Sequence, residues 1–167
     1  VTASGISPRA FPLQSAALVV ADSDEHNEEG HLIEDAETRT AMVLKRQRKL
    51  DGLRNDMAEP IITLRPKAEF TLVGWGSTCG AVREAAELLD ADGVPVNTIH
   101  LSGLWPFPVD AVTRALANSP KTFVIESNAT GQLARLMRAE TGIKAHKSIL
   151  KFDGRPFSPQ YIVNALK

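Results

Sequence analysis

From residue 70 onwards the sequence alternates between short apolar runs and segments with helical spacing. The run FTLVGWG predicts a buried strand, and apolar residues then recur at the i, i+3, i+4, i+7 positions of a helix over about 78–90: Val82, Ala85, Ala86 and Leu89. Two more strand–helix units follow, with strands at 96–101 and 121–125 and helices over 109–116 and 131–140. Three such units in a row predict an α/β fold, a three-layer α/β/α sandwich with a mostly parallel sheet.

The chain ends with a further strand expected at 148–152 and a terminal helix that begins at Ser158-Pro159 and runs to Leu166. Asp35 is expected to cap an earlier helix that starts near Ala36, becomes basic in its later turns and ends before Pro60. The segment from there to residue 66 is expected to be a connector.

Residues 1–16 contain Gly5, Pro8 and Pro12, which are turn signals, and predict an extended linker. The chain opens with Val1 rather than Met, so we expect an upstream domain to precede it. The apolar run 17–21 (ALVVA) predicts a short strand, and residues 17–167 are expected to form one α/β domain.

Composition excludes several classes of protein. A net charge of -1 gives no basis for a nucleic-acid or membrane partner, and no apolar run reaches the length of a membrane span. Cys79 is the only cysteine, so an iron–sulfur cluster with four cysteine ligands from this chain is impossible. A cytoplasmic protein is expected.

The segment Gly74-Trp75-Gly76-Ser77-Thr78-Cys79-Gly80 follows a predicted strand and opens a helix, where backbone N–H groups can hold an anion. Its G-x-G-x-x-x-G spacing, and the lack of an acidic residue at the end of the next strand, disfavour NAD. The alternatives are a tight turn with glycines for close packing or an anion site that includes Gly74, Gly76, Ser77, Thr78 and Gly80.

The stretch 22–37 holds eight acidic residues, two histidines and no Lys or Arg, and predicts a loop. An EF-hand is excluded, because Asn27 stands where glycine is needed and Ile33 where a bidentate Glu is needed. Histidines and carboxylates can act as metal ligands or in proton transfer, and the alternative is a solvated acidic loop. The candidate residues are Glu25, His26, Glu28, Gly30 and His31.

A third group of candidates, Glu126, Asn128 and Gln132, follows the strand at 121–125 at the edge where parallel sheets present ligands. Glu126 could pair across an interface or act in catalysis, whereas capping of the next helix also explains Asn128. Cys79 at a helix start is interpreted as a packing residue. The basic run 45–49 is either a solvated helix face or a surface that binds a partner or a phosphorylated cofactor.

Taken together, these blocks resemble the α subunits of 2-oxoacid:ferredoxin oxidoreductases, in particular the 2-oxoglutarate type. The resemblance is carried by DSDEHNEEGH at 22–31 with Glu34-Asp35 and Arg39, then GWGST at 74–78, Glu126-x-Asn128, and DGRPF at 153–157. It extends over nearly the whole chain, and GISPR at 5–9 is similar to the family's link from a preceding domain. Asn27 departs from the Asp expected there.

The resemblance implies a domain similar to the C-terminal domain of transketolase, within an enzyme that oxidatively decarboxylates a 2-oxoacid to an acyl-coenzyme A. It implies thiamine diphosphate, magnesium, an iron–sulfur cluster and coenzyme A in the whole enzyme. It also implies a β subunit that carries thiamine diphosphate and the iron–sulfur cluster, ferredoxin as acceptor, and an oligomer. No diphosphate-binding G-D-G motif is present, so we expect this chain alone to bind no cofactor and to be inactive. Its expected role is in subunit assembly and in shaping one wall of the active site, with a stand-alone anion-binding module as the alternative.

Overall fold

The computed structural model describes residues 2–14, 16, 19 and 23–166, and the chain forms two compact units, Val1–Asp56 and Met57–Lys167. The division falls at 56/57, whereas the sequence placed a boundary after residue 16. The strand expected at 17–21 lies outside the described residues, except for Val19.

The second unit is built on a five-stranded sheet with the order β1-β3-β2-β4-β5. Its strands are β1 (Ile61–Thr63), β2 (Phe70–Trp75), β3 (Val96–Leu101), β4 (Thr122–Glu126) and β5 (Lys147–Leu150). All neighbouring pairs are parallel except β1 with β3, which is antiparallel. Val73 of β2 lies beside Ile99 of β3 and Val124 of β4, so the centre of the sheet is apolar.

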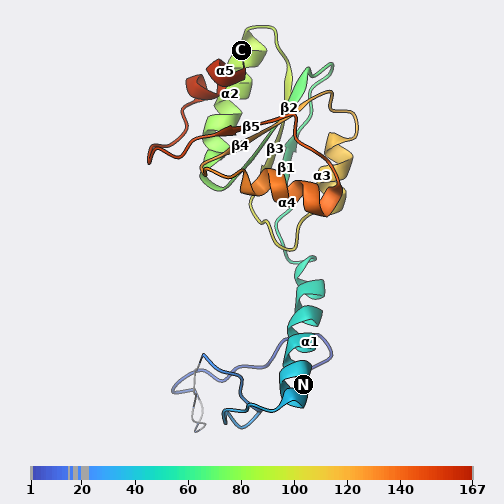
Figure 1. Ribbon diagram of the computed structural model, residues 1–167, viewed down its shortest axis with the longest axis vertical. Coiled ribbons are helices and arrows are strands. Elements are labelled where there is room, and N and C mark those ends of the chain that lie inside the picture. Colours follow the sequence, from blue (N-terminus) through green and yellow to red (C-terminus); the bar gives the residue numbers. More distant parts are fainter. Residues whose placement is uncertain (1, 15, 17–18, 20–22, 167) are drawn as a thin grey trace. The chain divides into compact units, whose positions relative to one another are not determined.

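Four helices cover this sheet in two layers, with α2 and α5 on one face and α3 and α4 on the other (Figure 1). They are α2 (Cys79–Ala91), α3 (Val109–Leu116), α4 (Gln132–Thr141) and α5 (Pro159–Leu166). Side chains alternate along β2, so that Leu72 enters the core beneath α2 and α5 and Val73 enters the core beneath α3 and α4. The predicted three-layer, mostly parallel α/β fold is confirmed.

One expectation about this unit is wrong. The segment before residue 66 contains β1 at 61–63 rather than only a connector. All three residues of β1 are exposed, so this edge strand carries none of the apolar alternation by which sequence patterns reveal strands.

The first unit contains the helix α1 (Ala36–Leu53), whose start is fixed by Asp35 as expected. The Asp35 carboxylate accepts a hydrogen bond of 2.7 Å from the Thr38 N–H, which satisfies one of the free donors of the first turn. Gly5 packs against this helix with φ +79°, and a Cβ atom there would lie 2.4 Å from the Lys45 carbonyl oxygen. The segment can approach α1 so closely because position 5 is glycine.

No helix within the described residues is long and apolar enough to cross a membrane.

Candidate functional site

The acidic segment of the first unit is a short hairpin-like turn. The Asn27 N–H donates to the His31 carbonyl at 3.0 Å, and the Ile33 N–H donates to the Glu25 carbonyl at 3.0 Å. Gly30 lies inside the inner of these two bonds and provides the left-handed conformation, with φ +85°, that the turn requires. The described part of the segment before Ala36 is a loop, as its composition predicted, and these hydrogen bonds give the loop a defined turn.

Asn27 organises this turn with its side chain. Its Oδ1 atom accepts hydrogen bonds from the N–H groups of Glu29 (3.0 Å) and His31 (2.9 Å). An Asx-type turn of this kind uses the side-chain oxygen in place of a backbone acceptor. An amide oxygen serves this purpose as a carboxylate would, so the change from the expected Asp does not disturb the turn.

Glu25 joins the turn to α1. Its carboxylate accepts a 2.7 Å hydrogen bond from Arg46 Nη1 and lies 3.5 Å from Arg39 Nη1. The hydrogen bond and charge of Arg46, with the charge of Arg39, hold the pKa of Glu25 below its ordinary value. The Glu25 side chain is only 17% exposed, whereas those of Arg39 and Arg46 are 60% and 46% exposed. The sequence-predicted candidate Glu25 therefore acts here as an anchor of the turn.

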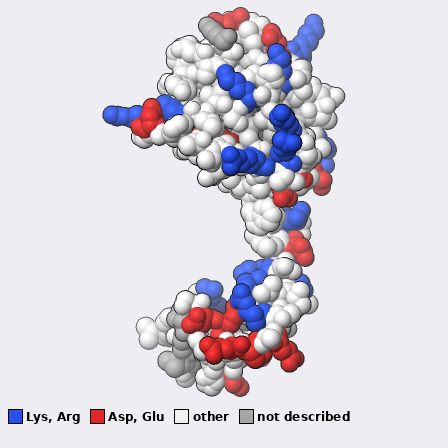
Figure 2. All heavy atoms as spheres, viewed as in Figure 1, with Lys and Arg blue, Asp and Glu red and all other residues white. Residues whose placement is uncertain are grey.

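A pocket of about 780 Å³ lies within the first unit, between the turn and α1. Its described lining residues are Thr2, Ser7, Pro8, His26, Asn27, Glu28, Thr38, Ala41, Met42, Leu44, Lys45 and Arg48. Two predicted site residues, His26 and Glu28, thus meet two residues of the basic helix, Lys45 and Arg48. Figure 2 shows acidic and basic side chains gathered next to one another on this unit.

This pocket combines a mostly apolar lining, to which Met42 and Leu44 belong, with a few polar and charged groups. The His26 Nδ1–H donates to the Asn27 carbonyl at 2.8 Å, because a carbonyl oxygen can only accept. That bond fixes the tautomer and leaves Nε2 available as an acceptor in the neutral ring. Lys45 donates to the Ser7 hydroxyl, which connects the N-terminal segment to the helix. His31 and Gly30 do not line this pocket.

In the second unit, the turn after β2 is closed by Thr78. Its hydroxyl accepts from the Trp75 N–H at 3.0 Å and donates to the Trp75 carbonyl at 2.8 Å. A Cβ atom at Gly74 would lie 2.6 Å from this hydroxyl oxygen. Gly74 and Thr78 therefore have the close-packing role that the sequence left open. An anion site at the exposed residues Gly76, Ser77 and Gly80 stays a prediction.

Glu126 at the end of β4 is completely buried and holds the start of α4. Its carboxylate accepts hydrogen bonds from the N–H groups of Leu133 (2.6 Å) and Ala134 (3.1 Å) and from the Asn128 side-chain amide (2.8 Å). A carboxylate enclosed by a helix N-terminus is stabilised by the amide donors and by the helix dipole. Because no part of it reaches solvent, Glu126 positions the loop rather than pairing across an interface.

Asn128 completes the same loop. Its Oδ1 atom accepts from the N–H groups of Thr130 (3.0 Å), Gly131 (2.8 Å) and Gln132 (3.3 Å). Asn128 therefore caps the start of α4, which is one of the two alternatives from the sequence. The side chain of Gln132 is exposed, and its role as a ligand group stays a prediction.

One strand-end residue received no role from the sequence. His100, near the end of β3, has a buried Nδ1 atom without a hydrogen-bond partner among the described residues. Burial lowers the pKa of His100 and favours the neutral imidazole. Its place in the strand was predicted, but an unpaired ring nitrogen depends on packing that no local motif records.

The residues that the structure describes contain no group of three or more His, Cys, Asp or Glu side chains able to hold a metal ion. Cys79 is the only cysteine in the sequence, so this chain cannot supply the four ligands of a four-cysteine iron–sulfur cluster.

Comparison with known proteins identifies the family of this chain. A family model described as pyruvate:ferredoxin oxidoreductase core domain II matches residues 68–162, which is more than half of the chain. The chain belongs to this family. Residues 68–162 thus have the fold of core domain II. The resemblance found in the sequence is confirmed.

Two curated relatives match this chain over almost all of its length. It is 37% identical over 170 residues to subunit α of 2-oxoacid:ferredoxin oxidoreductase 2 of Aeropyrum pernix, covering all of this chain and 26% of that protein. It is 33% identical to subunit α of 2-oxoacid:ferredoxin oxidoreductase 1 of Sulfurisphaera tokodaii, covering 99% of this chain and 26% of that protein. The chain spans about a quarter of the length of these relatives.

Solved structures of two other proteins are similar to this chain. A 2-oxoglutarate:ferredoxin oxidoreductase from Magnetococcus marinus, with 2-oxoglutarate, coenzyme A and succinyl-CoA bound, matches 99% of this chain and 29% of its own, with a TM-score of 0.81 and 34% identity. A transketolase from Pichia stipitis matches 64% of this chain and 17% of its own, with a TM-score of 0.51 and 13% identity. The latter likeness concerns the fold alone.

Proposed function

We propose that this chain is a core domain II segment of the α subunit of a 2-oxoacid:ferredoxin oxidoreductase, with 2-oxoglutarate as its 2-oxoacid. The observation that carries the proposal is the match of the whole chain to α subunits of such enzymes, at 37% identity for one of them. The 2-oxoglutarate preference is supported by the similarity, at a TM-score of 0.81, to an enzyme that holds 2-oxoglutarate and coenzyme A.

Within this enzyme the first unit serves subunit assembly and forms one wall of the active-site region. α1, all of whose residues the structure describes, buries none of them, so an isolated helix of this kind gains little from packing. Large apolar side chains on this unit are exposed: Ile6, Phe11, Leu13, Val19, Leu32, Leu44 and Leu53. Such residues gain free energy if another part of the protein covers them.

The cofactors belong to the whole enzyme in this proposal. Thiamine diphosphate with magnesium would supply carbanion stabilisation, and an iron–sulfur cluster in the β subunit would carry electrons to ferredoxin in the cytoplasm. The sequence of this chain has no diphosphate-binding G-D-G motif and a single cysteine, so its proposed contribution is to bind and position. The pocket lined by His26, Glu28, Lys45 and Arg48 is the candidate for contact with the partner or with coenzyme A.

The test is reconstitution. The full α subunit that contains this chain is combined with its β subunit, and coenzyme A-dependent reduction of ferredoxin is followed with 2-oxoglutarate, pyruvate and a branched 2-oxoacid. We expect turnover only from the combined subunits, with 2-oxoglutarate giving the highest kcat/KM. Turnover by this chain alone would overturn the assembly role.

A different result would decide between the two hypotheses from the sequence. If the combined subunits oxidise no 2-oxoacid, and this chain without the β subunit binds inorganic phosphate and loses that binding in Ser77→Ala, the stand-alone anion module is correct. Ser127→Ala, in the exposed loop after β4, is the control for that experiment.

A further inference from the structure

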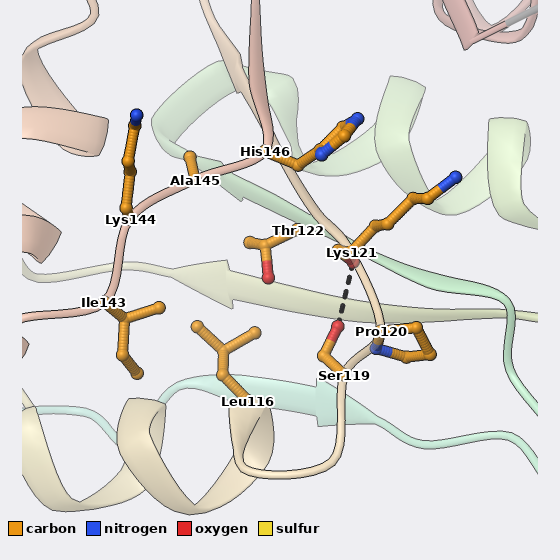
Figure 3. Close-up of a pocket in the computed structure, with 9 residues that line it drawn as sticks. All are labelled: Leu116, Ser119, Pro120, Lys121, Thr122, Ile143, Lys144, Ala145 and His146. Carbon is orange, nitrogen blue, oxygen red and sulfur yellow. Dashed lines mark hydrogen bonds between the residues drawn. The ribbon is translucent and has the colours of Figure 1, made fainter.

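A second pocket lies in the second unit, at the amino ends of β4 and β5, opposite the strand ends described above. It has a volume of about 360 Å³ and is lined by Leu116, Ser119, Pro120, Lys121, Thr122, Ile143, Lys144, Ala145 and His146. In Figure 3 the side chains of Lys121, Lys144 and His146 extend on one side of this group, and those of Leu116 and Ile143 lie on the other. The pocket therefore has a basic side and an apolar side.

The basic side is not neutralised. Among the described residues no carboxylate forms an ion pair with Lys121, Lys144 or His146, and no acidic residue lines the pocket. In Figure 3 the amino ends of Lys121 and Lys144 extend in different directions from the two sides of the hollow, and both side chains are exposed and free to turn towards an anion that enters it. The volume lies at the lower end of the range for small-molecule sites.

A chain of hydrogen bonds makes the floor of the pocket rigid. The Asn97 amide donates to the Thr71 hydroxyl at 3.3 Å, the Thr71 and Ser119 hydroxyls are 2.8 Å apart, and Ser119 donates to the Lys121 carbonyl at 2.9 Å. Asn97 and Thr71 are buried, and the Asn97 side-chain oxygen also accepts from the Arg65 N–H at 2.8 Å. The bonds run from the edge of the sheet to the backbone of Lys121, so they hold the loop at 119–121 in place before any ligand arrives.

The His146 side of the pocket is fixed as well. The His146 N–H donates to the Thr122 carbonyl at 2.8 Å, and its ring packs edge-on against Phe123 with a centroid distance of 5.4 Å. Positions 121 and 146 directly precede the adjacent strands β4 and β5, so their backbones are held in place, and a fixed backbone lowers the entropy that is lost on binding.

We propose that this pocket binds a small organic anion, whose phosphate or carboxylate group is held by Lys121, Lys144 and His146 and whose apolar part rests on Leu116 and Ile143. The inference is independent of the enzyme assignment, because it uses only the geometry of the second unit. No local motif marks the site: its basic residues come from two separate segments, and the parallel pairing of β4 with β5 brings these together.

The experiment measures the reactivity of individual lysines in the assembled enzyme. Acylation by an N-hydroxysuccinimide ester is followed by mass spectrometry at Lys121 and Lys144, with rising inorganic phosphate in one arm and butyrate in the other. Ionic strength is held constant, since salt screens exposed charges. Lys67, an exposed lysine of the same unit outside the pocket, is the control within each sample.

We expect saturable protection of Lys121 and Lys144 by at least one of the two anions, and none at Lys67. Phosphate protection identifies a phosphorylated ligand, and butyrate protection a carboxylate. In Lys144→Ala the concentration that half-protects Lys121 should rise at least about tenfold, because a charge-assisted hydrogen bond is lost.

Two results would overturn the proposal. In one, neither anion protects, or all three lysines slow to the same unsaturable extent. In the other, Lys121 and Lys144 are unreactive in the assembled enzyme before any anion is added and become reactive once the subunits are separated. That outcome would mean that a protein surface, not a small anion, occupies the pocket.

Discussion

Glu126 is a buried carboxylate stabilised by hydrogen-bond donors of the loop and helix that follow it. We predict that Glu126→Ala lowers the free energy of unfolding by roughly 3 kcal/mol, because the N–H groups of Leu133 and Ala134 lose their acceptor inside the protein. Urea denaturation of the wild type and the variant measures this difference.

Ser127→Ala is the matched control for that change. Ser127 is the adjacent residue and is exposed, so its substitution should alter the free energy of unfolding by less than about 0.5 kcal/mol. Equal unfolding midpoints for Glu126→Ala and Ser127→Ala would contradict the structural role of the Glu126 carboxylate.

The ion pair of Glu25 makes a prediction about pH. Arg46, by its hydrogen bond and then its charge, holds the pKa of Glu25 below the ordinary value of 4.5. The contribution of this pair to stability is therefore fully present above pH 4.5 and is lost as the pH falls through the lowered pKa of the folded state. In Arg46→Ala we expect the pKa of Glu25 to rise towards its ordinary value, measured by NMR titration of the carboxyl carbon.

Arg48→Ala provides the comparison, since Arg48 lies on the same helix and lines the pocket instead of contacting Glu25. Its removal should leave the Glu25 titration where it is in the wild type. An equal rise in both variants would mean that the general positive charge of α1, and not the Arg46 contact, sets the pKa.

At the scale of elements, the docking of the N-terminal segment on α1 depends on Gly5. Gly5→Ala should loosen this segment, because the added Cβ atom would lie 2.4 Å from the Lys45 carbonyl and φ +79° is unfavourable for alanine. Hydrogen exchange should become faster at residues 2–9 in the variant. Gly52→Ala, which meets no atom within 4 Å, should instead slow exchange in α1, since alanine favours a helix. Unchanged exchange at residues 2–9 in Gly5→Ala would contradict the contact.

Sequence patterns could predict the elements that bury an apolar face. Val82, Ala85 and Leu89 of α2 are buried at the spacing that predicted the helix. β1 was missed because its three residues are exposed and its position is set by pairing with β3, a contact distant in sequence.

The candidate sites illustrate the same limit for function. The acidic loop at 22–37 and the basic helix were each predicted from the sequence. That His26 and Glu28 share a pocket with Lys45 and Arg48 follows from the way the loop folds back on α1. Ser7 lines this pocket although no sequence signal marks it, because its place depends on the close approach at Gly5. Glu126 was chosen as a candidate because it lies at the end of a predicted strand. That its carboxylate is buried follows from the N–H groups of α4 that surround it, which the sequence does not reveal.

For the whole molecule, the described apolar core lies entirely in the second unit. Every buried hydrophobic side chain of the described residues falls between Leu72 and Val163, in two clusters on opposite faces of the sheet. Each such side chain contributes about 1.5–3 kcal/mol when it is removed from water, so this unit contains most of the free energy that opposes unfolding. The first unit depends on ion pairs, caps and turn hydrogen bonds, which contribute less per residue.

This division predicts how fragments behave. Residues 57–167 expressed alone should give dispersed NMR spectra and a single cooperative unfolding transition, because both core clusters are complete within them. Residues 1–56 alone should lack a cooperative transition, since α1 buries none of its residues. A fragment of residues 68–167 is the informative control, because it retains both clusters but lacks β1 and the Arg65 N–H that bonds to Asn97. It should still unfold cooperatively, at a lower denaturant concentration. If residues 57–167 fail to fold without residues 1–56, then the first unit supplies packing that the two clusters do not contain, and its role extends beyond subunit assembly.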